Sequence, residues 1–142
     1  MKIVVNRCFG GFGLSALAEK EYLAKKGKTA YFYEQTKYSF KDGKEEYRRV
    51  DDVNKKSQAL YYTTVEKDLG DVINGFPEDV DFFSTYDMKR DDPDLVNIVE
   101  KLGESANGDF AELDVVEIPD DVEWEIDEYD GMESIHEVHR SW

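Results

Sequence analysis

The chain alternates short apolar runs with polar segments, and each run has the length of a strand or a short helix. Residues 2 to 6 form an apolar, β-branched run that predicts a buried strand. Glycines interrupt it, and Ser15 then stands where the cap of a helix over residues 16 to 26 is expected, with Gly27 placed to end that helix. The start of the chain therefore predicts a strand, a glycine loop and a helix.

The following segments favour strands over helices. Residues 29 to 34 are aromatic and β-branched and predict a second strand, and residues 45 to 50 predict a weaker third strand. Residues 59 to 64 fit a strand or the end of a short helix, and their periodicity does not decide between the two. Residues 65 to 92 predict mainly loops, with one short element near residues 81 to 84.

A capped helix is the clearest element of the second half. Asp92, Pro93 and Asp94 supply a cap, a first-turn proline and a carboxylate at the positive end of the helix dipole. An apolar stripe follows from Leu95 to Leu102, and the Asn-Gly pair at residues 107 and 108 is expected to end the helix.

The last third of the chain predicts a hairpin and a final helix. Residues 112 to 118 and 122 to 129 surround Pro119 and are expected to pair with each other. In the second arm apolar and acidic residues alternate, which places carboxylates on one face of the strand. Residues 132 to 139 predict a short helix.

Together these elements predict a compact α+β fold. We expect a mixed or antiparallel sheet of about five strands with two to three helices, in a single domain over residues 1 to 142. No apolar run approaches the roughly 20 residues that a membrane helix needs, and the N-terminus lacks the features of a signal peptide. With one cysteine, which fits a reducing compartment, the expected location is the cytoplasm.

Charge is distributed unevenly along the chain. Residues 1 to 64 carry 13 Lys and Arg against 8 Asp and Glu, whereas residues 65 to 142 carry 5 against 25. Repulsion among so many carboxylates opposes folding, so the excess serves either solubility or a positively charged partner. The same charge makes direct binding of the second half to nucleic acid unfavourable.

The acidic strands are the candidate partner-binding surface. Regularly spaced carboxylates resemble in kind the phosphate repeat of a nucleic acid, and exposed aromatic side chains are common anchors at interfaces. The candidates for partner binding are Glu112, Asp114, Glu117, Asp120, Asp121, Glu123, Trp124, Glu125, Asp127, Glu128, Tyr129 and Asp130, with Trp142 as a further aromatic candidate.

The glycine loop offers an alternative site. The segment from Gly11 to Ala16 satisfies the G-x-G-x-x-A pattern between a predicted strand and helix, and an acidic residue closes the next predicted strand about 20 residues later. A nucleotide would then be held by Gly10, Gly11, Gly13, Ser15 and Glu34. The competing interpretation is a tight, well-packed turn, because the later segments do not continue as alternating strands and helices.

Other chemistry finds little support in the sequence. On a helix, Glu133 and His136 would share a face and supply two metal ligands, but His139 would lie off that face, and no further ligands are evident. No Ser-His-Asp arrangement or paired cysteines occur. We therefore expect no catalytic residues, no metal, no cofactor and no enzymatic activity.

The two ends of the chain, KIVVNRCFGGFGLS at residues 2 to 15 and EWEIDEYDGMESIHEVHRSW at residues 123 to 142, resemble small uncharacterised acidic proteins encoded by bacteriophages and prophages. The resemblance covers about a quarter of the chain. It implies a phage or mobile-element origin, and hence the cytoplasm of a bacterial host, but transfers no catalytic residues. Small acidic phage proteins are often inhibitors of host defence, including anti-CRISPR and anti-restriction proteins.

The first functional expectation is therefore an anti-defence inhibitor that mimics nucleic-acid charge. Its partner would be a basic host protein, a CRISPR or restriction nuclease, with no membrane and no direct nucleic acid involved. The alternative is a protein that binds a nucleotide or nucleotide-derived signal over the Gly10 to Ser15 loop, as a sponge or an enzyme. A third possibility is a phage structural or accessory protein whose acidity serves only solubility.

Overall fold

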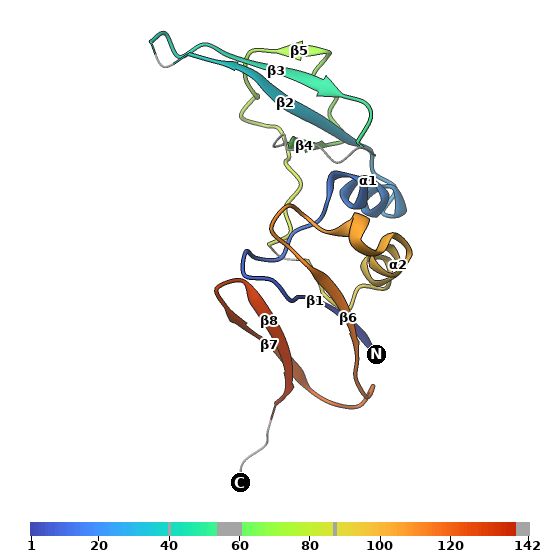
Figure 1. The fold of residues 1–142 in the computed structure, drawn as a ribbon. Coiled ribbons are helices and arrows are strands. Elements are labelled where there is room, and N and C mark those ends of the chain that lie inside the picture. Colours follow the sequence, from blue (N-terminus) through green and yellow to red (C-terminus); the bar gives the residue numbers. More distant parts are fainter. Residues whose placement is uncertain (40, 54–60, 87, 139–142) are drawn as a thin grey trace. The chain divides into compact units, whose positions relative to one another are not determined.

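A computed structural model describes residues 1–39, 41–53, 61–86 and 88–138 (Figure 1). Contacts along the chain cluster into two compact units. Unit 1 combines Met1–Ala18 with Ser84–Trp142, and unit 2 is the intervening segment Glu19–Phe83. The predicted single domain stays a prediction.

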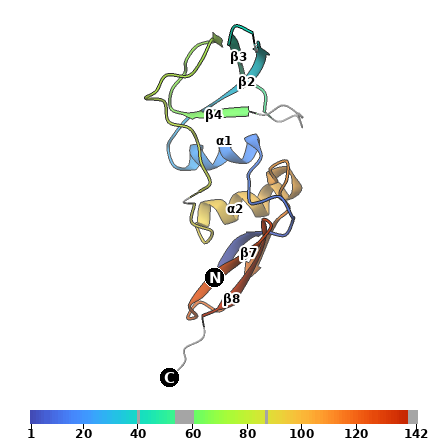
Figure 2. The same ribbon diagram turned by 90° about the vertical axis from the view of Figure 1, so that its left-hand side faces the viewer.

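The core of unit 1 is a pair of antiparallel strands under a helix. Strand β1 (Lys2–Asn6) pairs with β6 (Leu113–Glu117), so that Val4 lies opposite Val115. Helix α2 (Pro93–Leu102) packs against these strands and buries its apolar stripe (Figure 2). The predicted β1 is confirmed, and its apolar residues are fully buried because the strand lies inside the unit.

Helix α2 begins as its sequence predicts and ends earlier. The side chain of Asp92 accepts a hydrogen bond from the backbone N–H of Asp94, and Pro93 occupies the first turn. Gly103, with φ of 57°, ends the α-helix, and a short 3-10 helix, η1 (Gly103–Ala106), continues to the Asn-Gly pair that was expected to end it.

The second sheet of unit 1 corrects two predictions. Strands β7 (Trp124–Tyr129) and β8 (Met132–Glu137) form an antiparallel hairpin, so residues 132 to 137 are a strand and not the predicted helix. The predicted hairpin between residues 112 to 118 and 122 to 129 is also wrong, because the first arm pairs with β1 and the second with β8.

The turn between β7 and β8 explains both corrections. Its two central residues, Asp130 and Gly131, have φ of 49° and 86°, the conformation of the tight turns that match the twist of hairpin strands. Asp-Gly is a strong short-range hairpin sequence, and it outweighs the helical spacing of the acidic and histidine side chains that follow.

Unit 2 contains a four-stranded antiparallel sheet in the order β4-β2-β3-β5. Its strands are β2 (Ala30–Tyr38), β3 (Glu45–Val50), β4 (Tyr61–Val65) and the short β5 (Val72–Ile73). The first two confirm the predicted strands, and β4 shows that the undecided segment is a strand over its described residues. Phe82, in the predicted short element, makes an isolated bridge to Thr64.

Aromatic side chains hold unit 2 together. Phe76 lies among Tyr33, Tyr47, Tyr62 and Phe82, with ring centroids 4.7 to 5.8 Å from its own. Such edge and tilted contacts stabilise a core beyond the area that they bury. Through Phe76 and Phe82 they hold the mostly irregular segment from residue 65 to 83 against the sheet.

Helix α1 (Ala16–Lys25) begins in unit 1 and ends in unit 2. Ser15 accepts a hydrogen bond from the N–H of Ala18, and Gly27 has φ of 75°, so both predicted helix ends are confirmed. The α+β class is confirmed as well. The described residues form eight strands, more than the five or so predicted, and two α-helices. No helix among them is long and apolar enough to cross a membrane.

Candidate functional site

The acidic excess belongs almost entirely to unit 1. Its two segments carry 6 Lys and Arg against 19 Asp and Glu, whereas unit 2 carries 12 against 14. The two units are less polarised than the two halves of the sequence, because unit 1 takes in the weakly basic start of the chain and the acidic residues from 65 to 83 belong to unit 2. Unit 1 therefore carries the acidic surface of the protein.

Hairpin β7–β8 has two chemically different faces. Period two places Trp124 and Ile126 on one face of β7, with Ile135 and Glu133 beside them on β8. The opposite face carries Glu125 and Asp127, with His136 directly across from Glu125. The four side chains named on the first face are half-buried or buried, and only Glu128 and Glu137 at its ends are exposed. Both carboxylates of the second face are exposed, so the second face is the more accessible to a partner.

A buried ion pair anchors the hairpin to β1. Glu133, with a side chain only 7% exposed, receives two hydrogen bonds from Arg90, at 2.5 and 2.9 Å. The same carboxylate accepts the backbone N–H of Asn6 at 2.9 Å, at the edge of β1 opposite β6. The guanidinium of Arg90 also stacks on the ring of Phe12, 3.5 Å from its centroid. Glu133 therefore supplies, at this edge of β1, the hydrogen-bond acceptor that a neighbouring strand would otherwise provide to the Asn6 N–H.

Asn6 completes this buried network. Its side chain donates to the carbonyl oxygens of Cys8 and Gly131 and accepts from the N–H groups of Cys8 and Glu112. One fully buried amide thus connects the glycine loop, the approach to β6 and the β7–β8 turn. These contacts hold the loop after β1 in place.

Glycines allow these segments to approach backbone to backbone. A Cβ on Gly10 would lie 2.3 Å from the carbonyl oxygen of Phe110, and a Cβ on Gly108 would lie 2.9 Å from the carbonyl carbon of Gly13. A Cβ on Gly131 would likewise lie within 3 Å of the backbone atoms of Gly10 and Gly11 in the loop after β1. We call this contact of Gly10, Gly11 and Gly131 the glycine junction, and it gives the glycine pattern a structural reason.

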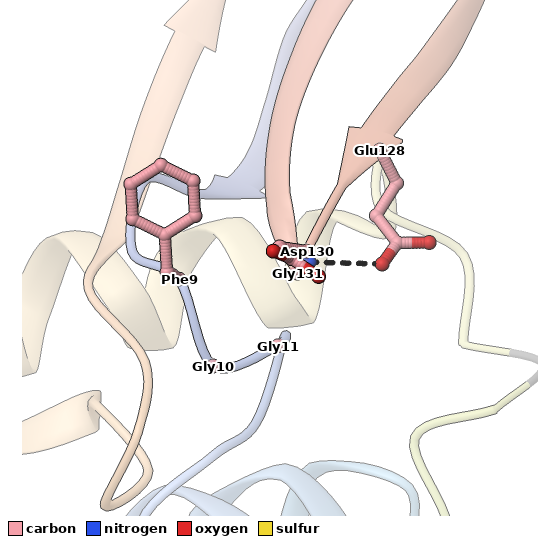
Figure 3. A pocket seen from close by; sticks show the side chains of 6 residues that line it. All are labelled: Phe9, Gly10, Gly11, Glu128, Asp130 and Gly131. Carbon is pink, nitrogen blue, oxygen red and sulfur yellow. Dashed lines mark hydrogen bonds between the residues drawn. The ribbon is translucent and has the colours of Figure 1, made fainter.

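An open depression of about 510 Å³ lies beside the glycine junction (Figure 3). Phe9 stands on one side and Glu128 on the other, with Asp130 between them. The Phe9 ring is 62% exposed, and Glu128 accepts a hydrogen bond from the N–H of Gly131. An exposed aromatic ring next to two carboxylates is suited to a guanidinium or ammonium group.

The ten carboxylates predicted to bind a partner are all exposed. Trp124 is half-buried on the inner face of β7, and Tyr129 is 76% exposed near the turn. Neighbouring cations offset part of the charge. Asp114 pairs with Arg7 at 3.3 Å, and the N-terminal ammonium of Met1 holds the pKa of Asp120 below its ordinary value. Trp142 and His139 lie outside the described residues.

The residues of the alternative nucleotide site are divided between the units. Gly10, Gly11, Gly13 and Ser15 belong to unit 1, and Glu34 belongs to β2 in unit 2. Strands β1 and β2 are also in different sheets, whereas a dinucleotide fold places the corresponding strands side by side. Nucleotide binding at this loop stays a prediction, with less support from the topology than from the sequence pattern.

Two features of the site escaped the sequence analysis. His136 contacts Glu125 and Asp127 and not Glu133, because a strand turns residues three apart to opposite faces. Phe9 and Asp130 line the same depression because tertiary packing brings together two turns that are far apart in the sequence. The Asp-Gly turn was the available signal for the first feature, and no local signal marks the second.

Comparison with known proteins gave no match, whether with protein-family models, curated proteins or solved structures.

Proposed function

We propose that this protein binds a basic surface of a nucleic-acid-handling protein, a nuclease of CRISPR or restriction type, and inhibits it stoichiometrically. The contact surface is unit 1, centred on the outward face of hairpin β7–β8 and the turn that follows β7. The protein acts by occupying the partner's nucleic-acid site and catalyses no reaction.

One observation carries this proposal: unit 1 concentrates 19 acidic residues, and all ten predicted partner-binding carboxylates are exposed. Alternate residues of a strand lie about 6 to 7 Å apart on one face. Glu125 and Asp127 are alternate residues of β7 on one face, so carboxylates recur along the strand as charges recur along a nucleic-acid backbone, and these two converge to within 4.8 Å beside His136. A channel lined with Lys and Arg would attract such a face from a distance.

The depression supplies a specific anchor within this electrostatic contact. A partner's arginine would place its guanidinium against the Phe9 ring and pair with Glu128 or Asp130. The exposed Tyr129 ring is a second anchor next to it in the chain. Long-range charge would speed association, and these contacts would slow dissociation.

The proposal is tested with two variants that lose the same number of negative charges, one in unit 1 and the other in unit 2. A hairpin variant carries Asp121→Asn, Glu123→Gln, Glu128→Gln and Asp130→Asn. A control variant carries Asp52→Asn, Glu66→Gln, Glu78→Gln and Asp81→Asn in unit 2, where these residues are also exposed. Both lose four charges, and the Gln and Asn side chains keep the hydrogen-bond acceptors of the turn.

Each protein is immobilised and used to capture proteins from a bacterial lysate. The proposal predicts that the native chain and the control variant retain the same nucleic-acid-binding protein, that the hairpin variant does not, and that target DNA or guide RNA displaces it. Equal capture by both variants would contradict a contact through unit 1.

A further inference from the structure

Glu125, Asp127 and His136 meet on the outward face of hairpin β7–β8. Glu125 lies directly across from His136 in the register, and Asp127 is two residues further along the same face. One ligand atom from each residue lies within 4.8 Å of the other two. We propose that these three residues form a binding site for a divalent transition metal, of which zinc fits best.

The donor set favours zinc over the alkaline-earth cations. One imidazole nitrogen and two carboxylate oxygens are common zinc ligands, and three protein ligands leave a fourth position for water. Calcium takes six to eight oxygen ligands, and magnesium usually keeps several waters and is bound through carboxylates. Copper and nickel share the preference for imidazole, so they are expected to compete with zinc here.

The contacts of His136 show that the three groups already converge. Its Nε2 atom lies 2.6 Å from Glu125 Oε1, and its Nδ1 atom lies 2.6 Å from Asp127 Oδ2. The second contact is not aligned as a hydrogen bond, and Nδ1 is shielded from solvent. One ring nitrogen binds the ion, and because one ligand atom of each residue already lies within 4.8 Å of the other two, the exposed carboxylate on the other side of the ring needs only a side-chain rotation to complete the three protein ligands.

The strand that carries His136 is held in place independently of the site. Glu133, three residues earlier on β8, points to the opposite face and is fixed by Arg90 and the backbone of Asn6. A ligand on an anchored strand loses less freedom on binding than one on a free loop. The metal site does not depend on the proposed function. The hairpin variant that tests that function leaves Glu125, Asp127 and His136 unchanged, so the two proposals can fail separately.

The test uses the full chain, freed of metal with a chelator and titrated with zinc chloride in a calorimeter. The expected result is one tight site per chain, accompanied by a rise in the thermal midpoint. His136→Asn should weaken that site by roughly tenfold or more, and Glu125→Gln and Asp127→Asn should each weaken it.

Two controls separate this site from general attraction of cations. Glu137→Gln removes one charge from the adjacent residue on the opposite face of β8, and His139→Ala removes the only other histidine. Both should keep native affinity. NMR of the imidazole rings gives a second readout, in which zinc shifts the His136 signals in the native chain. Unchanged binding by His136→Asn, or ring signals of His136 that do not respond to zinc, would overturn the proposal.

Discussion

A Cβ atom added to Gly131 would lie 2.2 Å from the backbone nitrogen of Gly11, so the β7–β8 turn rests directly on the loop that follows β1. Real Cβ atoms do not approach backbone so closely, and no flexible side chain can move aside here. The glycine junction therefore fixes where the acidic turn lies within unit 1.

This contact predicts that Gly131→Ala destabilises unit 1 by about 2 kcal/mol or more, from a left-handed backbone and a steric clash together. Gly103→Ala is the matched control, because Gly103 also has positive φ but has no neighbour near its Cβ position. It should cost only the strain of its backbone conformation, with φ of 57° and ψ of −129°, and therefore less than Gly131→Ala, which adds a steric clash. Urea unfolding followed by tryptophan fluorescence reports on unit 1, which contains both tryptophans. Equal losses in the two variants would mean that the close packing is absent.

The Arg90 and Glu133 pair predicts a large effect from a single neutral substitution. Glu133→Gln leaves the guanidinium of Arg90, whose side chain is only 17% exposed, without its countercharge and should cost about 3 kcal/mol in the free energy of unfolding. Glu100→Gln breaks the exposed pair with Lys2, whose side chains are both nearly half exposed, and should change stability by about 0.5 kcal/mol or less. Similar losses from the two substitutions would show that Glu133 is not an anchor.

Glu19 predicts a pH dependence in unit 2. Burial raises the pKa of Glu19 to about 7, although Thr63 donates a hydrogen bond to its carboxylate. Because the folded-state pKa is the higher one, this group's contribution to stability is complete below the unfolded value near 4.5 and is lost as the pH rises through about 7.

Glu19→Gln keeps the acceptor for Thr63 and removes the titration. At about pH 5 the variant and the native chain should unfold at similar urea concentrations, and at about pH 8.5 the variant should be more stable by about 2 kcal/mol. Comparing the two at each pH cancels the repulsion of the other carboxylates. A stability difference that does not change with pH would refute the raised pKa.

Helix α2 and β1 could be predicted because their determinants are local. A cap, a proline and an apolar stripe are contained within residues 92 to 102, and three β-branched residues suffice to indicate a buried strand. The partner of β1 could not be predicted, because β6 lies more than a hundred residues away and pairing depends on the assembled core.

The candidate site shows the same division. Exposure of the carboxylates followed from the alternating pattern of β7, which the sequence displays directly. The neighbours of His136 depended on whether its segment is a helix or a strand, and the Asp-Gly turn was the clue that decided it. The position of Phe9 beside Asp130 arises only from tertiary packing.

The central claim is that unit 1 binds its partner through charge, and the salt dependence of the captured complex tests it most directly. Raising the salt from about 0.1 M to about 1 M shortens the screening length from about 10 to about 3 Å. The account predicts that the native complex weakens by more than tenfold over this range and that the hairpin variant shows a shallower dependence. A complex that survives about 1 M salt unchanged would contradict the account.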